Sequence, residues 1–323
     1  MKDKIIVLVA PKFFSYDEMI KKGLEDMGAK VFAYDARYSN TTKDKILMKK
    51  ARLFAHESIK RYYEGVFRDI EHLEIDYLFL VDALTCPVWF IQKLHRLKPD
   101  MEVITYNWDS IANQKELLRI SNEAHKKFSF DPDDCEKYGY TFRPTFFDPD
   151  YEAAAGDYPK TSDLFFVGTA HNDRYRILET LKKSGFKTDF YYYLQSKLQF
   201  FYYKYIQRSY PKSANPQDFN YEGLTKAQVI ERMKHAEAVV DIQHAGQTGL
   251  TLRPFETLGM KKKLVTTSAT VKNYGFYNEK NILIIDRENP VIPPEFLKEK
   301  YEEIPAEIYN KYTLEAFLKD IFK

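Results

Sequence analysis

The sequence has only two cysteines and lacks the residue patterns that most metal and redox sites require. Cys86 and Cys135 form no CxxC pair, and none of the seven histidines belongs to an HExxH motif. We therefore expect neither a structural zinc site nor a disulfide framework. No stretch approaches the ~20 apolar residues of a membrane-spanning helix, and the apolar run at residues 5–10 is too short for a signal peptide. These absences predict a cytoplasmic protein, either soluble or peripheral at the inner face of the membrane.

A strong excess of charge of one sign is also lacking. The net charge is +2 over 323 residues, so the overall balance gives no reason to expect a nucleic-acid partner, and none is expected. Aromatic residues, in contrast, are abundant, with 25 Tyr and 24 Phe. The length predicts two domains of roughly 150 residues each.

The amino-terminal half alternates short apolar runs with amphipathic helical patterns. This alternation predicts an open, doubly wound parallel sheet with helices on both faces. The loop at residues 11–15 has no GxGxxG fingerprint, so we expect no dinucleotide there. Strands are predicted at residues 4–10, 30–34, 76–81, 102–106 and 127–130, and helices at 16–27, 43–70 and 88–97.

The carboxyl-terminal half repeats the alternation after a cluster of prolines and aspartates at residues 143–162, which predicts an interdomain linker. We thus expect two Rossmann-like domains, residues 1–150 and 151–323, with the last helix (about 312–323) packing back on the first. Such domains bind ligands at the carboxyl ends of their strands, here in a cleft between the two sheets. In the second half, strands are predicted at 163–168, 188–193, 238–242 and 264–267, and helices at 174–184, 225–235 and 313–322.

The most informative stretch runs from Gly249 to Thr267, which predicts a glycine-containing loop, a short helix and a buried strand. A helix that begins beside such a loop offers free backbone N–H groups and the positive end of its dipole, and these bind a diphosphate. Glu256, one turn into the helix, is placed to accept hydrogen bonds from two adjacent sugar hydroxyls. The stretch therefore predicts a nucleotide-sugar pocket, although Arg253 and Glu256 also fit a plain surface ion pair.

Two further loops are expected at the same edge of the sheet. In the first, Gly168 follows a predicted strand and would let the backbone turn tightly, and Arg174 near the next helix is placed to pair with a phosphate. The second loop follows the strand that ends near Asp241, and its glycines permit close approach of the backbone to an anion. Its candidate ligand-binding residues are His244, Gly246 and Gly249.

In this order the motifs resemble the carboxyl-terminal domain of GT-B glycosyltransferases, particularly the spore-maturation-protein-type group. That group has a Val-Gly loop with a downstream Arg, then an Arg-x-Phe-Glu helix, a glycine and an apolar strand. The resemblance covers roughly residues 163–290. Its residues here are Val167-Gly168 with Arg174, then Arg253-Pro-Phe-Glu256, Gly259 and the run at 264–267.

The resemblance implies a GT-B enzyme that moves a sugar from a nucleotide-diphosphate donor to an acceptor hydroxyl, with no metal and no cofactor. Compared with retaining group-1 glycosyltransferases, Arg174 stands at the spacing of a diphosphate-binding lysine, and Glu256 matches a ribose-binding glutamate. Thr248 stands where those enzymes have a further glutamate. The donor-binding candidates are thus Gly168, Arg174, His244, Gly246, Thr248, Gly249, Arg253 and Glu256.

In such enzymes residues 1–150 would form the acceptor domain and residues 151–323 the donor domain. Asp109 follows a predicted strand end and is a candidate general base, with Trp108 beside it to stack on a sugar face. The alternative is that Asp109 or Ser110 caps the next helix. Asp82, at the end of another strand, is the second catalytic candidate.

A rival pattern is the Asp-x-Asp motif of metal-dependent sugar transferases. Asp131-Pro-Asp133 follows an apolar run, and Asp148-Pro-Asp150 repeats the spacing. Asp-Pro is also a common helix start, with Asp as the N-cap and Pro at the first position. We favour the helix start and expect no metal.

The segment at residues 199–212 mixes aromatic with basic residues. Together with the basic residues of the predicted helix 43–70, it fits docking on anionic lipid headgroups. Nucleic-acid binding gives a similar pattern, and so does an aromatic helix packed on its own domain with solvated Lys and Arg tips.

With the resemblance, the expected function is glycosyl transfer to a glycan or lipid-linked glycan acceptor. The expected pathway is the biosynthesis of bacterial surface polysaccharide or lipopolysaccharide. Two alternatives stay open: a transferase of the same fold that moves glycerol phosphate or pyruvate, and a non-catalytic nucleotide- or sugar-binding protein.

Overall fold

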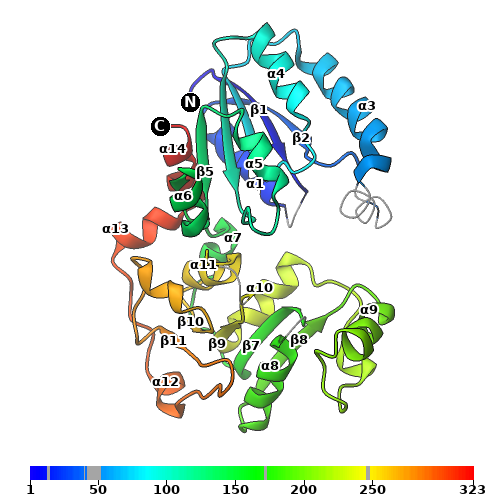
Figure 1. Cartoon of the computed structure of the whole chain (residues 1–323). Helices are drawn as coiled ribbons and strands as arrows, with labels where there is room; N and C mark the ends of the chain where they lie inside the picture. The colour runs from blue at the N-terminus through cyan, green and yellow to red at the C-terminus, as the bar shows by residue number, and fades with distance from the viewer. Residues whose placement is uncertain (13–14, 40, 42–51, 171–172, 245–247) are drawn as a thin grey trace. The chain divides into compact units, whose positions relative to one another are not determined.

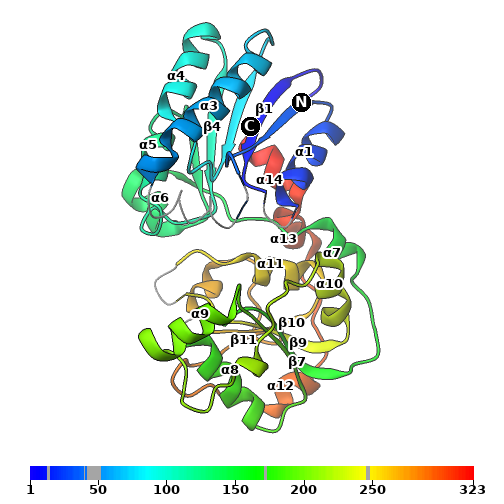
Figure 2. The same ribbon diagram turned by 90° about the vertical axis from the view of Figure 1, so that its right-hand side faces the viewer.

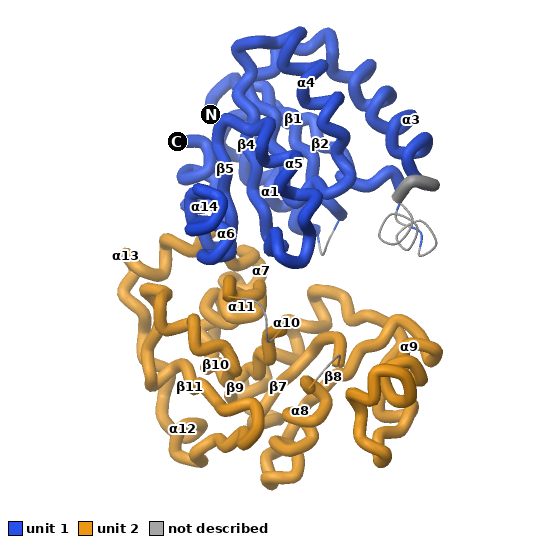
Figure 3. Tube along the Cα trace, viewed as in Figure 1, with its two compact units in different colours: residues 1–145, 314–323 blue, residues 146–313 orange. Residues whose placement is uncertain are grey.

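The computed structural model describes residues 1–12, 15–39, 41, 52–170, 173–244 and 248–323. The chain forms two compact α/β units (Figure 3). Unit 1 comprises residues 1–145 and 314–323, and unit 2 comprises residues 146–313. The chain therefore leaves unit 1 after Thr145 and returns to it for its last helix.

Unit 1 contains a six-stranded sheet in which every neighbouring pair of strands is parallel. In spatial order its strands are β2 (Lys30–Asp35), β1 (Ile5–Ala10), β3 (Tyr77–Val81), β4 (Glu102–Asn107), β5 (Lys126–Ser129) and β6 (Thr141–Phe142). Its helices are α1 (Tyr16–Asp26), α3 (Arg52–Ile70), α4 (Val88–Leu97), α5 (Glu116–Ser121), α6 (Pro132–Tyr138) and α14 (Leu314–Ile321). Figure 2 shows α3 and α4 on one face of the sheet and α1 and α14 on the other.

The helices bury both faces of the sheet, which is why its strands are apolar runs. Helix α3, predicted over residues 43–70, is described from Arg52 onward, and residues 42–51 lie outside the described part of the chain. Its buried side chains Ile59, Val66 and Ile70 pack with the sheet and α4 in one core cluster.

Helix α14 completes the other face of this sheet although it lies at the far end of the chain. The ring of Phe317 meets that of Tyr106 edge-to-face at 4.8 Å, and Phe322 contacts Phe79 in the same way at 5.3 Å. Gly23 of α1 allows close packing, because a Cβ there would lie 2.7 Å from Leu318. The last helix is therefore an integral part of unit 1.

Unit 2 contains a five-stranded sheet, also parallel throughout. In spatial order its strands are β11 (Ile282–Ile284), β10 (Lys263–Thr266), β9 (Ala236–Asp241), β7 (Ser162–Thr169) and β8 (Thr188–Tyr193). Its helices are α7 (Pro149–Ala153), α8 (Arg174–Lys183), α9 (Lys197–Phe201), α10 (Lys226–Lys234), α11 (Leu252–Gly259), α12 (Pro294–Lys298) and α13 (Ala306–Tyr309). A π-helical segment, η1 (Tyr202–Ile206), continues α9.

The two sheets confirm the prediction of two doubly wound, Rossmann-like halves (Figure 1). The predicted strands are all present, with ends shifted by one or two residues, and two short edge strands, β6 and β11, were not predicted. In the described part of the chain, no helix combines the length and the apolar composition that crossing a membrane requires.

Candidate functional site

Each sheet has one point at which its strand order reverses. In unit 1 the chain passes from β1 to β2 on one side and then to β3 on the other, and in unit 2 it passes from β7 to β8 and then to β9. Doubly wound sheets bind ligands at such switch points, beyond the carboxyl ends of the strands. The residues that follow β3 and those that follow β7 and β9 are therefore the first candidates for a site.

Arg174 lies at the switch point of unit 2, as the first residue of α8. Its Nε donates to the carbonyl oxygen of Ile242, and its Nη1 donates to that of Thr169 at 3.1 Å. Burial lowers the pKa of Arg174, and the nearby carboxylate of Asp241 opposes this shift. The guanidinium is thus held between the ends of β7 and β9, where this fold binds anionic ligands.

Asp241, the last residue of β9, connects Arg174 to the stretch around α11. Its carboxylate accepts hydrogen bonds from the hydroxyls of Thr251 at 3.1 Å and Thr266 at 3.5 Å. Burial raises the pKa of this carboxyl, and the charge of Arg174 counteracts that shift. Because Thr251 is the N-cap residue of α11, these contacts fix the start of that helix at the carboxyl edge of the sheet.

Arg253 and Glu256 form the ion pair that their spacing allowed, but the pair is buried rather than on the surface. Arg253 Nη1 lies 2.7 Å from Glu256 Oε2, and the Glu256 side chain is only 10% exposed. Tyr151 of α7 shares a hydrogen bond with the Glu256 carboxylate. Burial raises the pKa of Glu256, and the guanidinium of Arg253 offsets part of that rise. The interpretation as a plain surface pair is therefore wrong.

Sequence reasoning missed a third arginine at this edge. Arg287 follows β11 and makes a bidentate pair with Asp173, with N–O distances of 2.9 and 2.8 Å. It also donates to the backbone oxygen of Gln243 at 3.1 Å and to the hydroxyl of Thr267 at 2.9 Å. The sequence contains a signal for Arg287, because Asp286-Arg287 directly follows the apolar run that forms β11.

We call this set of charged residues the arginine edge. It consists of three arginines and three acids at the carboxyl ends of the strands of unit 2: Arg174, Arg253, Arg287, Asp173, Asp241 and Glu256. Each arginine has an acid close to it, so the charges are fixed in place by their partners. Guanidinium groups in such a setting bind phosphate oxygens with defined geometry.

The predicted turn at Gly168 is wrong, because the strand continues through it. Gly168 pairs with Tyr192 of β8, and Thr169 pairs with Tyr193. A side chain at Gly168 would meet the ring of Phe166 at 3.2 Å, so the glycine serves close packing on the strand. The strand ends at Thr169, and α8 begins at Arg174.

The loop between β9 and α11 contains the other predicted donor-binding residues. His244 is exposed directly after Gln243, Thr248 is half-buried, and Gly249 is buried. The backbone oxygen of Thr248 accepts a hydrogen bond from the Thr270 hydroxyl at 2.9 Å. Gly246 lies outside the described residues.

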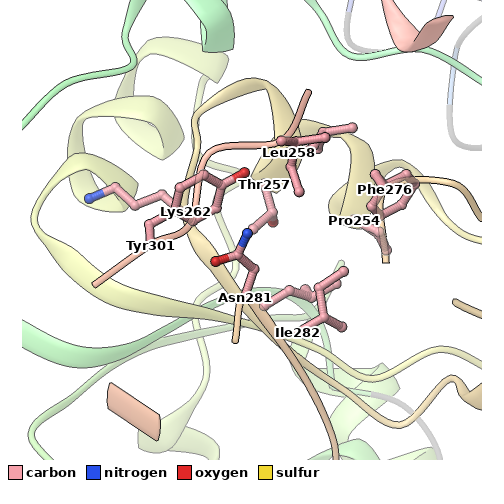
Figure 4. Close-up of a pocket in the computed structure, with 10 residues that line it drawn as sticks. Pro254, Thr257, Leu258, Lys262, Phe276, Asn281, Ile282 and Tyr301 are labelled. Carbon is pink, nitrogen blue, oxygen red and sulfur yellow. The ribbon is translucent and has the colours of Figure 1, made fainter. Parts of the chain in front are cut away.

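A small cavity lies against another side of α11. Figure 4 shows Pro254, Thr257 and Leu258 of this helix on one side, with Asn281 and Ile282 on the other. Its free volume of about 10 Å³ is that of about one water molecule, far too small for a nucleotide. This cavity is therefore not a candidate for a nucleotide site.

Asp82 occupies the switch point of unit 1, immediately after β3. Its φ of 42° lies in the left-handed region, which is unusual for a residue other than glycine and is typical of strained functional positions. Its Oδ1 accepts a hydrogen bond from the backbone N–H of Asp109 at 3.2 Å. Burial, together with the negative charge of Asp109, raises the pKa of Asp82 to about 8.

The two predicted catalytic residues therefore lie side by side, and we call Asp82 and Asp109 the aspartate edge. Trp108 is half-buried, and its ring packs edge-to-face on Tyr16 at 6.2 Å. Neither Asp109 nor Ser110 caps the following helix, because α5 begins at Glu116 with Lys115 at the N-cap. That alternative is wrong because a turn separates β4 from α5.

A pocket of about 440 Å³ opens in unit 1 among residues of α3, α4 and α5. Thr85 lines it, three residues after Asp82, together with Trp89 at the start of α4 and the basic residues Lys60 and Arg119. Its volume is within the range of small-molecule sites, which is roughly 300–1,000 Å³. Glu116 also lines it, and its carboxylate lies 3.2 Å from Arg119, so the lining combines basic groups with an acid.

Both Asp-Pro-Asp sequences are helix starts. Asp131 caps α6 by accepting the N–H of Asp133 at 3.0 Å, and Asp148 caps α7 by accepting the N–H of Asp150 at 2.9 Å. Lys226 pairs with Asp148 at 2.8 Å. Within the described residues, no group of three or more His, Cys, Asp or Glu side chains is arranged to hold a metal ion.

The chain matches no protein-family model, and no curated protein matches it in sequence. Solved structures do match it over most of its length. Sucrose-phosphate synthase from Thermosynechococcus elongatus superposes with a TM-score of 0.59 at 9% identity, covering 88% of this chain and 87% of that one. UDP-GlcNAc 2-epimerase from Methanocaldococcus jannaschii, solved in complex with UDP-GlcNAc and UDP, has a TM-score of 0.55 at 10% identity and covers 99% of both chains.

A third similar structure is α,α-trehalose 6-phosphate synthase from Burkholderia multivorans, with a TM-score of 0.50 at 12% identity over 99% of this chain and 93% of that one. At such identities the likeness establishes the fold. Together with the two parallel sheets, these neighbours show that the chain has the GT-B fold, built from two Rossmann-like domains, as the sequence predicted.

Proposed function

We propose that this protein is a glycosyltransferase that transfers a sugar from a nucleotide-diphosphate donor to an acceptor hydroxyl. The observation that carries the proposal is the guanidinium of Arg174 between the ends of β7 and β9, at the switch point of unit 2. Two structural neighbours are sugar-phosphate synthases, and a third was solved with UDP-GlcNAc and UDP. The products and ligands for which these neighbours are named support a nucleotide sugar as the ligand at the carboxyl edge of the sheet in unit 2.

The arginine edge would bind the donor. Arg174 and Arg253 would neutralise the diphosphate as it leaves, with help from the backbone N–H groups at the start of α11. Glu256 would accept hydrogen bonds from the ribose hydroxyls. The remaining donor contacts would come from the loop after β9 and the end of β7, namely Gly168, His244, Gly246, Thr248 and Gly249.

The aspartate edge would activate the acceptor. Asp82 has a pKa of about 8, close to the value that suits a general base near neutral pH. It would take the proton of the acceptor hydroxyl while that oxygen attacks the anomeric carbon and the nucleoside diphosphate departs. Asp109 would assist by raising the pKa of Asp82. The pocket lined by Trp89, Lys60 and Arg119 would hold the acceptor glycan.

We further propose that the reaction needs no metal ion, because the guanidinium groups supply the positive charge that a leaving diphosphate requires. A glycan or lipid-linked glycan acceptor in bacterial surface polysaccharide or lipopolysaccharide assembly fits the resemblance to the spore-maturation-protein-type group. Thr248, in place of a second glutamate, separates this chain from the retaining group-1 pattern.

Calorimetry with UDP, GDP, CDP and ADP tests the donor assignment directly. We expect one of these nucleoside diphosphates to bind, and Glu256→Ala to weaken that binding. A donor screen then separates sugar transfer from transfer of glycerol phosphate or pyruvate, since only the sugar transferase should slowly hydrolyse a nucleotide sugar without acceptor. Failure of all four nucleotides to bind would rule out the proposal.

A further inference from the structure

One short helical segment of unit 2 exposes an unusual concentration of apolar side chains. Of the eight large apolar side chains that are exposed among the described residues, five lie between residues 198 and 206: Leu198, Phe201, Tyr202, Tyr205 and Ile206. Leu198 is 79% exposed and Ile206 is 72% exposed. Figure 1 shows α9 at the periphery of unit 2, on the side of its edge strand β8. We call these five side chains the outer face of α9–η1.

The spacing of the outer face is that of one side of an amphipathic helix. Relative to Leu198, the other four residues stand at positions i+3, i+4, i+7 and i+8. In a surface helix this stripe normally faces the core, but here it faces solvent. The rings of Phe201 and Tyr205 stack on each other at 6.0 Å, so the outer face is continuous along the segment.

The opposite side of the same segment is anchored in unit 2. Phe200 is buried and packs on Phe219 at 5.2 Å and Tyr210 at 5.7 Å. Tyr203 also packs on Tyr210, at 5.6 Å. The segment is therefore fixed by its inner side, and the exposure of the outer face follows from the fold.

The residues that flank the outer face in the sequence are basic and not acidic. Between Asp189 and Asp218 the sequence contains no acidic residue, but it contains four basic ones: Lys197, Lys204, Arg208 and Lys212. The ammonium group of Lys204 donates to the carbonyl of Ala214 at 2.7 Å and lies over the ring of Tyr205, which keeps its charge beside the apolar stripe. An apolar stripe with basic flanks and no acids is the composition of a helix that lies in a membrane interface.

We propose that the outer face of α9–η1 docks this protein on a bilayer that contains anionic lipids. Leu198, Phe201 and Ile206 would enter the boundary between headgroups and acyl chains, and the tyrosine hydroxyls would stay at headgroup level. Lys197, Arg208 and Lys212 would contact the lipid phosphates. A second copy of the chain fits this face poorly, because two such faces would bring like charges together.

The proposal does not depend on the proposed glycosyl transfer, since docking and donor binding use different residues of unit 2. Co-sedimentation of the full-length protein with vesicles tests it. We expect binding to vesicles of phosphatidylcholine with phosphatidylglycerol and little binding to phosphatidylcholine alone. The double variant Leu198→Ser with Ile206→Ser should bind the anionic vesicles at least about tenfold more weakly, because it removes the two most exposed apolar side chains.

Val291→Ser is the matched control, because Val291 is an apolar residue of unit 2 that is 59% exposed and lies outside the outer face. It should bind vesicles as the wild type does, and all variants should keep the wild-type melting temperature and nucleotide affinity. The double variant Lys197→Gln with Lys212→Gln should also bind the anionic vesicles more weakly than the wild type. This loss should be larger at low salt than at high salt, because salt screens the charges.

Four outcomes would overturn the proposal. The first is that the wild type stays in the supernatant with both kinds of vesicle, and the second is that the double serine variant binds the anionic vesicles as well as the wild type. The third is a wild-type dimer in light scattering that the double serine variant abolishes, which would assign the outer face to self-association. Binding to generic oligonucleotides in preference to vesicles would count against it in the same way.

Discussion

The carboxyl edges of the two sheets have the same topology but opposite arrangements of charge. At the arginine edge, cations and acids alternate, as in the buried pair of Arg253 with Glu256. At the aspartate edge, a buried carboxyl lies beside a second carboxyl, and Asp82 and Asp109 are joined through a backbone N–H. Both edges lie at the switch point of a parallel sheet, where the strand order reverses.

The difference shows how one scaffold provides two kinds of chemistry. In a poorly solvated site an acid beside a cation stays ionised, whereas an acid beside another acid retains its proton to a higher pH. The arginine edge thus offers guanidinium groups that their acids hold in place, and such donors suit a departing diphosphate. The aspartate edge offers a group that can take up and release a proton near neutral pH.

Removal of the titratable acid should have the largest effect. We expect Asp82→Asn to lower kcat by about 10²–10⁴-fold, because an amide cannot take the proton of the acceptor hydroxyl. Asparagine tolerates the left-handed backbone at this position, so the variant should fold. The measurement is the initial rate of sugar transfer at saturating substrate.

Asp109→Asn is the matched control for this prediction. It removes the neighbouring charge but leaves the proposed base, so kcat should fall less than in Asp82→Asn. Nucleotide binding, measured by calorimetry, should be unchanged in both variants because the arginine edge belongs to unit 2. If Asp82→Asn transfers sugar at the wild-type rate, the aspartate edge is not catalytic.

Breaking an ion pair of the arginine edge should mainly affect stability. Glu256→Ala leaves Arg253 as a buried cation without its acid, which should lower the free energy of unfolding by about 3–5 kcal/mol in urea titrations. The control is Glu288→Ala, which removes the exposed partner of Arg176 and should cost at most about 1 kcal/mol. Equal losses in the two variants would mean that burial of the Arg253 pair has no energetic consequence.

Arg174 should matter for ligand affinity more than for stability. We expect Arg174→Gln to weaken nucleoside diphosphate binding by about 10- to 100-fold, the effect of losing a hydrogen bond to a charged group. Arg176→Gln is the control: it lies two residues further along α8, where its exposed side chain pairs with Glu288. Calorimetry that finds the same affinity in Arg174→Gln and Arg176→Gln would remove Arg174 from the donor site.

Much of the fold could be predicted because its strands are buried on both faces and therefore read as apolar runs. The run Ile5–Ala10 and the run that forms β7 are of this kind. Two of the four edge strands were missed because they are short: β6 has 2 residues and β11 has 3. Strands of this length contain too few positions to show a periodicity.

The ion pairs of the candidate site were predictable only where the two residues are close in sequence. The spacing of Arg253 and Glu256 indicated their ion pair, but the pair of Arg287 with Asp173 joins residues 114 positions apart. The turn expected at Gly168 was wrong because hydrogen bonding to β8 extends the strand past the glycine. The raised pKa of Asp82 depends on burial and on Asp109, and neither is visible in the local sequence.

A final expected effect is the pH dependence of stability that Asp82 causes. The pKa of Asp82 is about 8 in the folded chain, whereas an unperturbed Asp has a pKa of about 3.9. Between these values the folded chain holds a proton that the unfolded chain has lost, so the free energy of unfolding should fall as pH rises from about 4 to about 8. The slope from this one group is at most about 1.4 kcal/mol per pH unit.

Urea titrations of the wild type and Asp82→Asn across that range isolate this contribution, because the variant lacks the titrating group. The stability of the wild type relative to the variant should decrease steadily up to about pH 8 and then level off. The kcat/KM of the wild type should rise through the same pH, since a base must be ionised to accept a proton. A constant stability difference would mean that Asp82 is already ionised in the folded chain across this pH range, so that burial does not raise its pKa. The aspartate edge would then carry fixed charge, as the arginine edge does, and the two edges would differ only in that one has carboxylates alone and the other has guanidinium groups paired with acids.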